Sequence, residues 1–295
     1  MNRGNILLYR NLYRYITISM IFVSSLFSAE SENKNEMFQY LSNIYSNSWA
    51  LIIGINDYEN VEKLTYAIDD AKSIKKMLID KYGFKKSNII TLLDKDATKD
   101  GILDSFYDIT QKASEKDRVI VFYAGHGETQ ELPNGGDKGY LIPVDGNLDN
   151  LYRTSIPMQE MYDVAQMSAA KHILYLVDAC YGGLALNITR GLKKDEITPN
   201  YLKNMTREKG RQMITAGGKG ERVIEKSEWG HSALTHNLLK GLDQGLADEN
   251  GDKIITANEL GAFVKNRVSM DTDGSHTPLT GHIGTDLGEF IFISQ

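Results

Sequence analysis

From Trp49 onward, short apolar runs alternate with longer segments in which apolar residues recur at helical spacing. Continuous apolarity over strand length is typical of strands covered on both faces. We predict strands at 49–55, 88–93, 119–124, 141–144, 172–177, 212–216 and 290–294, and helices at 69–82, 102–113, 158–167, 232–242 and 257–268. Strand–helix alternation with short connections indicates an α/β fold, a mostly parallel doubly wound sheet with helices on both faces.

The N-terminal segment follows a different pattern. Arg3, Arg10 and Arg14 precede an apolar run at 15–29 that ends in small residues. A basic stretch followed by an apolar one about fifteen residues long is typical of a secretory signal peptide. The run is shorter than the roughly 20 residues of a membrane-spanning helix. Phe27 stands where the cleavage site would take a small residue, so an uncleaved membrane anchor is the alternative.

This segment decides the expected location of the protein. We expect 1–29 to be a signal peptide or membrane anchor, 30–47 a polar linker, and 48–294 the folded domain. The protein is then exported, either periplasmic or secreted, or anchored in a membrane by its N-terminus, rather than cytoplasmic. A membrane is expected as a partner only where the segment stays uncleaved.

A basic, weakly apolar segment at 187–211 interrupts the α/β pattern and predicts a surface linker between 48–186 and 212–294. The composition, 41% hydrophobic and 24% charged, is that of an ordinary soluble protein. The net charge of -6 argues against nucleic acid as a partner, because phosphate neutralisation needs clustered Lys and Arg.

Cys180 is the only cysteine of the sequence, which excludes an intramolecular disulfide and a zinc site built from several thiolates. It follows the predicted strand 172–177, and His126 follows the predicted strand 119–124. Both lie in turns rich in small residues, at the sheet edge where ligands bind in such folds. A thiol with an imidazole in reach is an activated nucleophile. The alternatives are a buried apolar cysteine and a structural or surface histidine.

The chain resembles the caspase-like peptidases, and among them the metacaspases and their bacterial relatives. The resemblance covers about 48–294 and is carried by an opening strand, a histidine motif, a cysteine motif and two further landmarks, at 49–56, 123–127, 178–182, 142–145 and 231–236. Cys180 lies 54 residues after His126, and caspases place these two residues about 50 apart.

The resemblance implies a three-layer caspase-like fold and a cysteine endopeptidase that forms an acyl-enzyme. Cys180 would be the nucleophile and His126 the general base, with the backbone N–H groups of Gly127 and Cys180 as the oxyanion hole. Residues 48–186 and 212–294 would be the large-subunit and small-subunit regions, and 187–211 a segment open to self-cleavage. A protein or peptide is the expected partner, and no cofactor is required.

The resemblance also implies a specificity for basic residues. Asp178 and Asp70 stand where metacaspases line the pocket for the residue before the scissile bond. Two carboxylates in a partly desolvated pocket select Arg or Lys by charge pairing. The alternative for Asp70 is an acid in the first turn of a helix, where it stabilises the helix dipole.

One segment has the spacing of a calcium loop. Residues 248–259 match an EF-hand at several positions, with Asp248, Asn250, Asp252 and Glu259 as candidate ligands, but Lys253 stands where the turn needs Gly. The alternative is a turn into a helix with Thr256 as N-cap and Glu259 three residues later. The other calcium site of some metacaspases is not matched, because Asn187 stands where Asp is expected.

Two other classes of function compete with the peptidase. A catalytically quiet caspase-like binding or scaffold protein would keep the fold with a protonated thiol or a blocked cleft. A redox or dimerising thiol would use Cys180 without any need for His126.

Overall fold

A computed structural model describes residues 38–179, 187–188, 199–218 and 223–294. The chain divides into two compact units, 1–43 and 44–295, and the second unit contains the sheet and the helices that pack on it. The predicted signal peptide or anchor at 1–29, and Cys180, lie outside the described residues. Within the described part of the chain, no helix is both long enough and apolar enough to span a bilayer.

The middle layer, within these residues, is a sheet of seven strands in the order β2-β1-β3-β7-β9-β13-β8. The strands β2, β1, β3, β7 and β9 are mutually parallel, and β13 is antiparallel to β9. The bounds are β1 Ser48–Gly54, β2 Ile89–Leu93, β3 Arg118–Ala124, β7 His172–Asp178, β8 Asn187–Ile188, β9 Gly210–Thr215 and β13 Leu279–Leu287.

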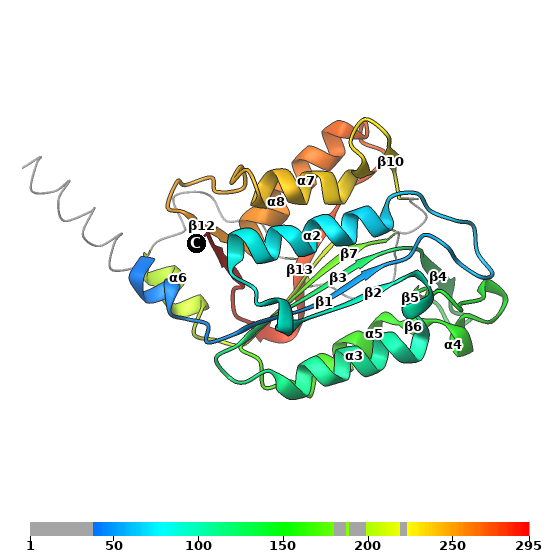
Figure 1. The fold of residues 1–295 in the computed structure, drawn as a ribbon, viewed down its shortest axis with the longest axis horizontal. Coiled ribbons are helices and arrows are strands. Elements are labelled where there is room, and N and C mark those ends of the chain that lie inside the picture. The colour runs from blue at the N-terminus through cyan, green and yellow to red at the C-terminus, as the bar shows by residue number, and fades with distance from the viewer. Residues whose placement is uncertain (1–37, 180–186, 189–198, 219–222, 295) are drawn as a thin grey trace, which may run out of the picture. The chain divides into compact units, whose positions relative to one another are not determined.

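Helices cover both faces of this sheet (Figure 1). One face carries α2 (Ala67–Tyr82), α7 (Ala233–Leu242) and α8 (Ala257–Asp271), and the other carries α3 (Lys99–Lys112) and α5 (Met158–Gln166). Successive residues of a strand point to opposite faces, so Ala50 and Ile52 join one buried core while Leu51 and Ile53 join the other. The three-layer α/β prediction is confirmed, and the double core explains why the strands read as continuous apolar runs.

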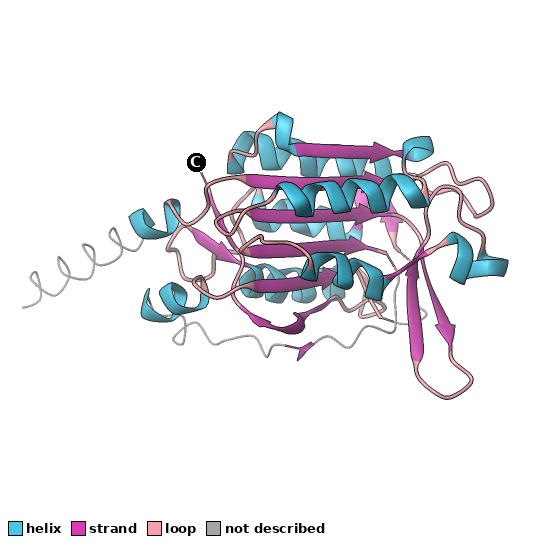
Figure 2. Cartoon of the chain, turned by 90° about the horizontal axis from the view of Figure 1, so that it is seen from below, coloured by secondary structure: helices cyan, strands magenta, loops and turns pink. Residues whose placement is uncertain are grey.

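The remaining elements lie around this frame. A hairpin of β4 (Gly127–Glu131) and β5 (Asp137–Leu141), extended by β6 (Ile156–Pro157), projects from the end where the parallel strands finish (Figure 2). The other elements are α4 (Leu151–Thr154), α6 (Pro199–Met205), the strand pairs β10–β11 (Glu225–Lys226, His231–Ser232) and β12–β14 (Ile254–Thr256, Ile291–Ile293), and short 3₁₀ turns at Lys86–Asn88, Asp94–Asp96 and Leu148–Asn150.

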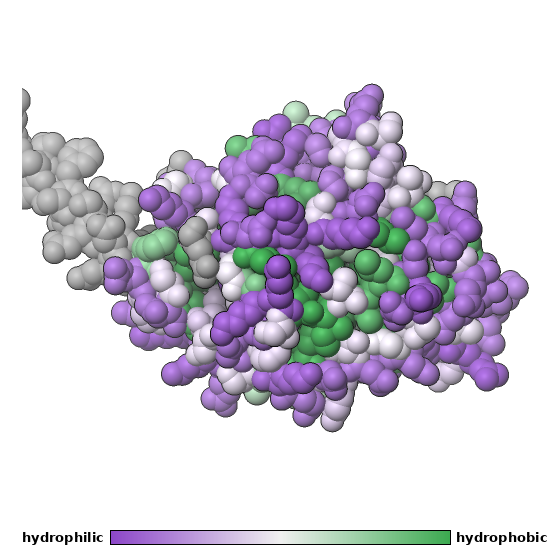
Figure 3. All heavy atoms as spheres, in the orientation of Figure 1, coloured by the Kyte–Doolittle hydropathy of each residue, from purple (hydrophilic) through white to green (hydrophobic). Residues whose placement is uncertain are grey.

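Hydrophilic side chains cover most of the face drawn in Figure 3, and hydrophobic ones gather in a band between the helices of the two faces. The edge strand β2 contributes partly exposed residues, because four of its five positions are only half-buried. Edge strands lack a neighbour on one side, so this partial exposure follows from the strand order.

Three sequence expectations need correction. The predicted strand 141–144 ends at Leu141, because Pro143 has no N–H to donate to a ladder and the chain turns at Gly146. The predicted strand at 290–294 pairs with β12 in a separate two-stranded sheet, not in the main sheet. The main sheet instead contains β13, which the apolar pattern did not predict because this strand is a mixture of Gly, polar and apolar residues.

The predicted surface linker 187–211 is also not uniform. Its C-terminal part contains α6 and the start of β9, and Arg211 is buried. The Arg211 guanidinium donates to the carbonyl oxygens of Ser168 and Ala170 at 3.3 and 3.0 Å. A buried arginine that satisfies backbone carbonyls cannot be told from a surface one by composition alone.

Arg118 connects three parts of the fold at the start of β3. Its guanidinium donates to Ser48 Oγ at 2.9 Å, to the Ile291 carbonyl at 2.9 Å and to the Tyr82 carbonyl at 3.2 Å. The side chain is buried against aromatic rings, and that burial lowers the pKa of Arg118 to about 10. One side chain therefore joins the N-terminal ends of β1 and β3 to the end of α2 and to β14.

We predict that Arg118→Met lowers the free energy of unfolding by about 3 kcal/mol, because two buried carbonyl groups lose their donor. Urea unfolding followed by circular dichroism measures this. Lys112→Met is the matched control, since its side chain is 55% exposed, and its effect should stay within about 0.5 kcal/mol. Equal effects of the two substitutions would contradict a structural role for Arg118.

Candidate active site

The strands β3 and β7, which precede the two motif turns in the sequence, end at the same edge of the sheet. They pair in parallel with Ala124 opposite Asp178, and the Gly125 N–H donates to the Asp178 carbonyl at 3.2 Å. His126 follows two residues after Ala124. Cys180 follows two residues after Asp178 in the sequence and lies outside the described residues. The register therefore brings the chain out of the sheet at matching positions before each predicted catalytic residue.

The His126 ring is held by the chain around it. Its Nε2 lies 2.7 Å from the carbonyl oxygen of Glu62, and a carbonyl only accepts, so Nε2 carries the hydrogen. The neutral ring then has its lone pair on Nδ1, where a proton can be taken up. The His126 backbone N–H donates to the Tyr58 hydroxyl at 2.7 Å, and the two rings lie 4.8 Å apart. This geometry suits a general base whose tautomer is set by a backbone group.

Gly127 begins β4 and has a backbone N–H that the hairpin does not use. Ile142 N–H donates to the His126 carbonyl at 3.0 Å, which makes Gly127 and Leu141 a non-hydrogen-bonded pair of the antiparallel ladder. The Gly127 N–H lies outside that ladder, one residue after the predicted base. It is chemically able to bind a developing oxyanion.

A cleft of about 590 Å³ opens beside His126. Acidic side chains outnumber basic ones in its lining, with Glu62, Glu128 and Glu225 against Lys63, and the Lys63 ammonium is itself paired with Asp57. The cleft is therefore electrically negative, which favours positively charged ligands.

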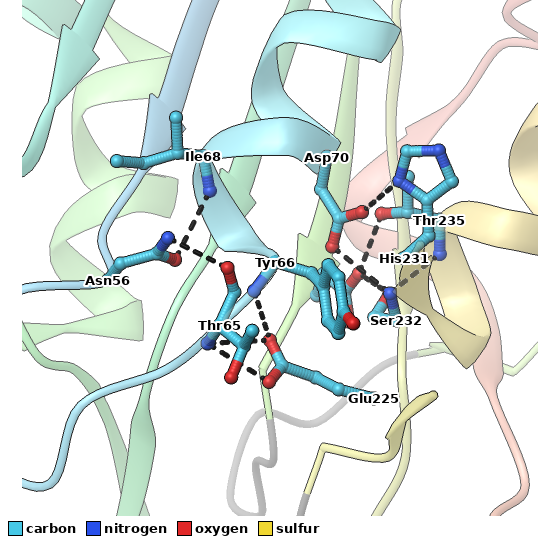
Figure 4. Close-up of polar contacts among 10 residues, drawn as sticks. Asn56, Thr65, Tyr66, Ile68, Asp70, Glu225, His231, Ser232 and Thr235 are labelled. Carbon is cyan, nitrogen blue, oxygen red and sulfur yellow. Dashed lines mark hydrogen bonds and ion pairs between the residues drawn. The ribbon is translucent and has the colours of Figure 1, made fainter. Parts of the chain in front are cut away.

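The carboxyl groups of Asp178 and Asp70 are both buried, each residue being only 1% exposed, and Ser232 bonds to both. Figure 4 shows Asp70 beside His231 and Ser232. The Ser232 hydroxyl donates to Asp178 Oδ2, and the Ser232 N–H donates to Asp70 Oδ2 at 3.3 Å. The Thr235 hydroxyl also donates to Asp178 Oδ2, at 2.7 Å. The two carboxyl groups singled out in the sequence thus lie close together through their shared partner Ser232, although α2 and β7 are far apart along the chain.

Burial destabilises the charged form of both carboxyl groups. Burial, and next the charge of Asp70, raise the pKa of Asp178 to about 7. Burial also raises the pKa of Asp70, opposed by its hydrogen bond to His231. Within the described residues, Asp178 Oδ1 is buried and has no hydrogen-bond partner. A buried carboxylate with an unused oxygen is the electrostatic complement of a cationic side chain.

Sequence reasoning missed two residues of this pocket. His231 Nδ1 lies 2.6 Å from Asp70 Oδ1, and the Glu225 carboxylate accepts from the N–H groups of Thr65 and Tyr66 at the start of α2. The segment 231–236 resembles a family motif, but this resemblance did not predict that His231 contacts Asp70. Only the placement of β10 and β11 against α2 shows these roles.

Comparison with known proteins identifies the family. The family model described as Caspase domain matches residues 47–282. The chain belongs to the caspase-domain family. Metacaspase-1 of Eremothecium gossypii is 31% identical over 190 residues, which are 59% of this chain and 40% of that protein. Metacaspase-1 of Schizosaccharomyces pombe is 29% identical over 197 residues, 62% of this chain and 44% of that protein. The chain thus matches less than half the length of these curated relatives.

Solved structures agree on the architecture of this caspase-domain protein. Caspase-1 from Spodoptera frugiperda superposes with a TM-score of 0.56 at 16% identity, over 83% of this chain and 90% of that one. A Geobacter sulfurreducens protein of solved structure gives the same TM-score and identity, over 81% and 94%. At this identity the likeness shows a shared fold.

In the candidate calcium loop of the caspase domain, the polar side chains form hydrogen bonds with the loop's own backbone N–H groups. Asp248 accepts from the N–H groups of Gly251 and Lys253 at 2.8 and 3.0 Å. Asn250 and Asp252 each accept from the backbone N–H two residues later in the chain. Glu259 and Thr256 form a complete capping box for α8, the alternative weighed for this segment. Lys253 takes a left-handed φ of 68°, where Gly would be unstrained.

The same loop was the candidate metal site. No group of three or more His, Cys, Asp or Glu side chains in the described ranges is arranged to hold a metal ion. The geometry shows a helix cap, and calcium binding at Asp248, Asn250, Asp252 and Glu259 stays a prediction.

We predict that Gly125→Ala lowers the free energy of unfolding by about 2 kcal/mol through overpacking. A Cβ at this position would overlap the Tyr58 hydroxyl and lie 2.8 Å from the Tyr123 hydroxyl. Urea unfolding of Gly125→Ala, Tyr58→Phe and the double variant forms a thermodynamic cycle. The double variant should be more stable than the sum of the single effects predicts, because the closer of the two clashing hydroxyls, that of Tyr58, is gone while the Tyr123 contact remains. Simple additivity would show that the Tyr58 hydroxyl does not clash with the new Cβ.

Proposed function

We propose that the protein is a cysteine endopeptidase that cleaves after Arg or Lys, with Cys180 as nucleophile and His126 as general base. The observation that carries the specificity is the buried carboxylate of Asp178, whose Oδ1 lacks a partner in the part of the chain that the structure describes. Asp178 stands two residues before Cys180 in the sequence. We infer that a side chain bound at this carboxylate belongs to the residue before the scissile bond.

The charge of the pocket decides between basic and acidic substrates. A guanidinium or ammonium group replaces the water lost by the carboxylates with charge-assisted hydrogen bonds. An aspartate side chain would instead place a third negative charge beside Asp70 and Asp178. The acidic cleft next to His126 acts in the same direction.

The reaction follows from the roles of the named groups. The thiol proton of Cys180 passes to Nδ1 of His126, and the sulfur attacks the peptide carbonyl carbon. The oxyanion accepts hydrogen bonds from the Gly127 and Cys180 N–H groups. His126 then donates its proton to the leaving amine as the C–N bond breaks. A water molecule, deprotonated by His126, hydrolyses the acyl-enzyme and regenerates the thiol.

We predict that peptides with Arg or Lys before the scissile bond are cleaved, while the matching Asp peptide is not. Cys180→Ala and His126→Ala should each lower kcat/KM by at least about 1000-fold, since each removes a member of the dyad. Fluorogenic peptides measure both effects.

Labelling by iodoacetamide at neutral pH should be fast in the wild-type chain and slow in His126→Ala. Slow labelling of both, without turnover, would favour the quiet scaffold. A disulfide dimer as the main species would favour the redox thiol.

We also predict that Asp178→Asn lowers kcat/KM for the Arg peptide by about 100-fold, mainly through KM, because the cation loses its ionised partner. The folded-state pKa of Asp178 is raised to about 7, so the carboxylate is charged above pH 7 and neutral below it. KM for the Arg peptide should therefore fall as pH rises from 6 to 8. Asp108→Asn, exposed on α3, is the control. An unchanged KM in Asp178→Asn would refute the role of this pocket.

A further inference from the structure

Two cavities of the described structure share a wall at Val223. The larger one, the cleft of about 590 Å³, is lined by His126 and by Gly127 at the start of β4. The smaller one is lined by Asp178. Val223 belongs to the lining of both, so the cavities are neighbours. The proposed function gives Asp178 the residue before the scissile bond and leaves the larger cleft without an occupant.

The proposed reaction decides which part of a substrate reaches the larger cleft. His126 gives its proton to the leaving amine, and the Gly127 N–H binds the oxyanion. The first residue after the scissile bond therefore lies against His126, which lines this cleft. The residue before the bond extends towards Asp178, which lines the other cavity. The segment that follows the bond is thus the part of the substrate nearest the larger cleft.

The strand β4 offers an extended peptide an edge to pair with. It is the outer strand of the three-stranded sheet β4-β5-β6, and Gly127, Glu128 and Thr129 all line the cleft. Gly127 is in a non-hydrogen-bonded pair with β5, and such pairs alternate along an antiparallel ladder, so Thr129 is in another. The backbone groups of Gly127 and Thr129 therefore point away from β5, to the side where a further strand can add.

Two acidic residues flank the path of such a peptide, and both line the cleft. Glu62 is exposed and lies next to the base, because its carbonyl oxygen is 2.7 Å from His126 Nε2. Glu128 is half-buried on β4, and its Oε1 accepts from the Thr129 N–H at 2.9 Å. A cationic side chain on the peptide would therefore have a carboxylate on either side of it.

The rest of the lining is compatible with this occupant. The Glu225 carboxylate already accepts from two backbone N–H groups at the start of α2, and the Lys63 ammonium is paired with Asp57. Leu148, which is 44% exposed, and Val61 present apolar surface to the cleft. Long basic side chains bury their methylene stems on such surface while the charged end stays in water.

We propose that this cleft binds the segment after the scissile bond as an extended strand along the outer edge of β4, and that Glu62 and Glu128 select basic residues in that segment. This inference rests on the proposed cysteine-peptidase reaction. The segment runs in the direction of β4, which begins beside His126 and projects from the end of the main sheet (Figure 2). With the oxyanion at the Gly127 N–H, parallel pairing makes the Gly127 carbonyl accept from the N–H of the second residue after the bond.

The first test compares three peptides as substrates of the full chain. They share an Arg before the scissile bond, and the three residues after it are all Lys, all Gln or all Glu. We expect kcat/KM to fall in the order Lys, Gln, Glu, with the Lys peptide about fivefold above the Gln peptide, because two partly exposed ion pairs form. Chromatography with mass spectrometry identifies the cleaved bond, so cuts after the added Lys residues are counted separately.

Variants assign this preference to the cleft. Glu62→Gln and Glu128→Gln should each lower the Lys-to-Gln ratio of kcat/KM, and the double variant should bring the ratio close to one. Gln keeps an oxygen that can accept from the Thr129 N–H, so the edge of β4 is preserved. Glu115→Gln is the matched control and should keep the wild-type ratio, because Glu115 is exposed in the turn before β3, at the end of that strand far from His126. Far-ultraviolet circular dichroism checks that each variant is folded.

The second test addresses the pairing with β4. N-methylation of the second residue after the bond removes the donor to the Gly127 carbonyl, and kcat/KM should fall by about fivefold. The N–H of the third residue points away from β4 in the same arrangement. Its methylation is the matched control and should have a smaller effect.

The outcomes separate this inference from the proposed function. Equal kcat/KM for the three peptides, or an unchanged Lys-to-Gln ratio in the double variant, would overturn the role of Glu62 and Glu128. Equal effects of the two methylations would overturn the pairing with β4. Cleavage after Arg would stand in each of these cases. A wild-type chain that cleaves none of the peptides, and none with Lys before the bond, would refute the proposed function and this inference together.

Discussion

The parallel register of β3 and β7 is the constraint on which the candidate site depends. Ala124 lies opposite Asp178, and the Gly125 N–H donates to the Asp178 carbonyl just past the end of the ladder. The strands that precede His126 and Cys180 in the sequence therefore end side by side. A shift of the register by one residue would also exchange the two buried faces of each strand, because side chains alternate. The cores on both faces thus protect the geometry of the site.

The proposed specificity for basic side chains depends on a second constraint, the desolvation of the charged groups of Asp70 and Asp178. Asp70 lies in the first turn of α2, Asp178 at the end of β7, and Ser232 at the start of α7, so three separate elements each contribute one part. Hydrogen bonds from Ser232 and Thr235 hold the carboxyl groups in a place from which water is excluded. Burial is the largest cause of both raised pKa values, which is the electrostatic basis of the proposal that this site takes a cationic side chain.

The surroundings of His126 and Asp70 are organised by backbone groups as much as by side chains. The Glu62 carbonyl selects the tautomer of His126, and the Glu225 carboxylate satisfies two N–H groups where α2 begins. Such contacts leave little trace in a sequence. A carbonyl oxygen is supplied by every residue type, and a glutamate that caps a distant helix resembles any surface glutamate.

Several features of this protein followed from the sequence by itself. The continuous apolar runs indicated strands buried on both faces, and the strand–helix alternation indicated a three-layer α/β fold, because period and burial are local properties of a chain. The motif turns pointed to His126 and Cys180, and motif positions pointed to Asp70 and Asp178. The sequence did not reveal β13 as a sheet strand, Arg211 as a buried residue, or the separate pairing of β14 with β12.

Only the tertiary structure decided which groups meet. Asp70 and His231 are 161 residues apart in sequence, yet their nearest side-chain atoms are 2.6 Å apart in space, and Glu259 closes the capping box of α8 with Thr256. The physical reason is that hydrogen bonds and charge interactions act over a few ångströms in space. Sequence patterns record the periodicity that each element needs, whereas the partner of each polar group depends on how those elements pack.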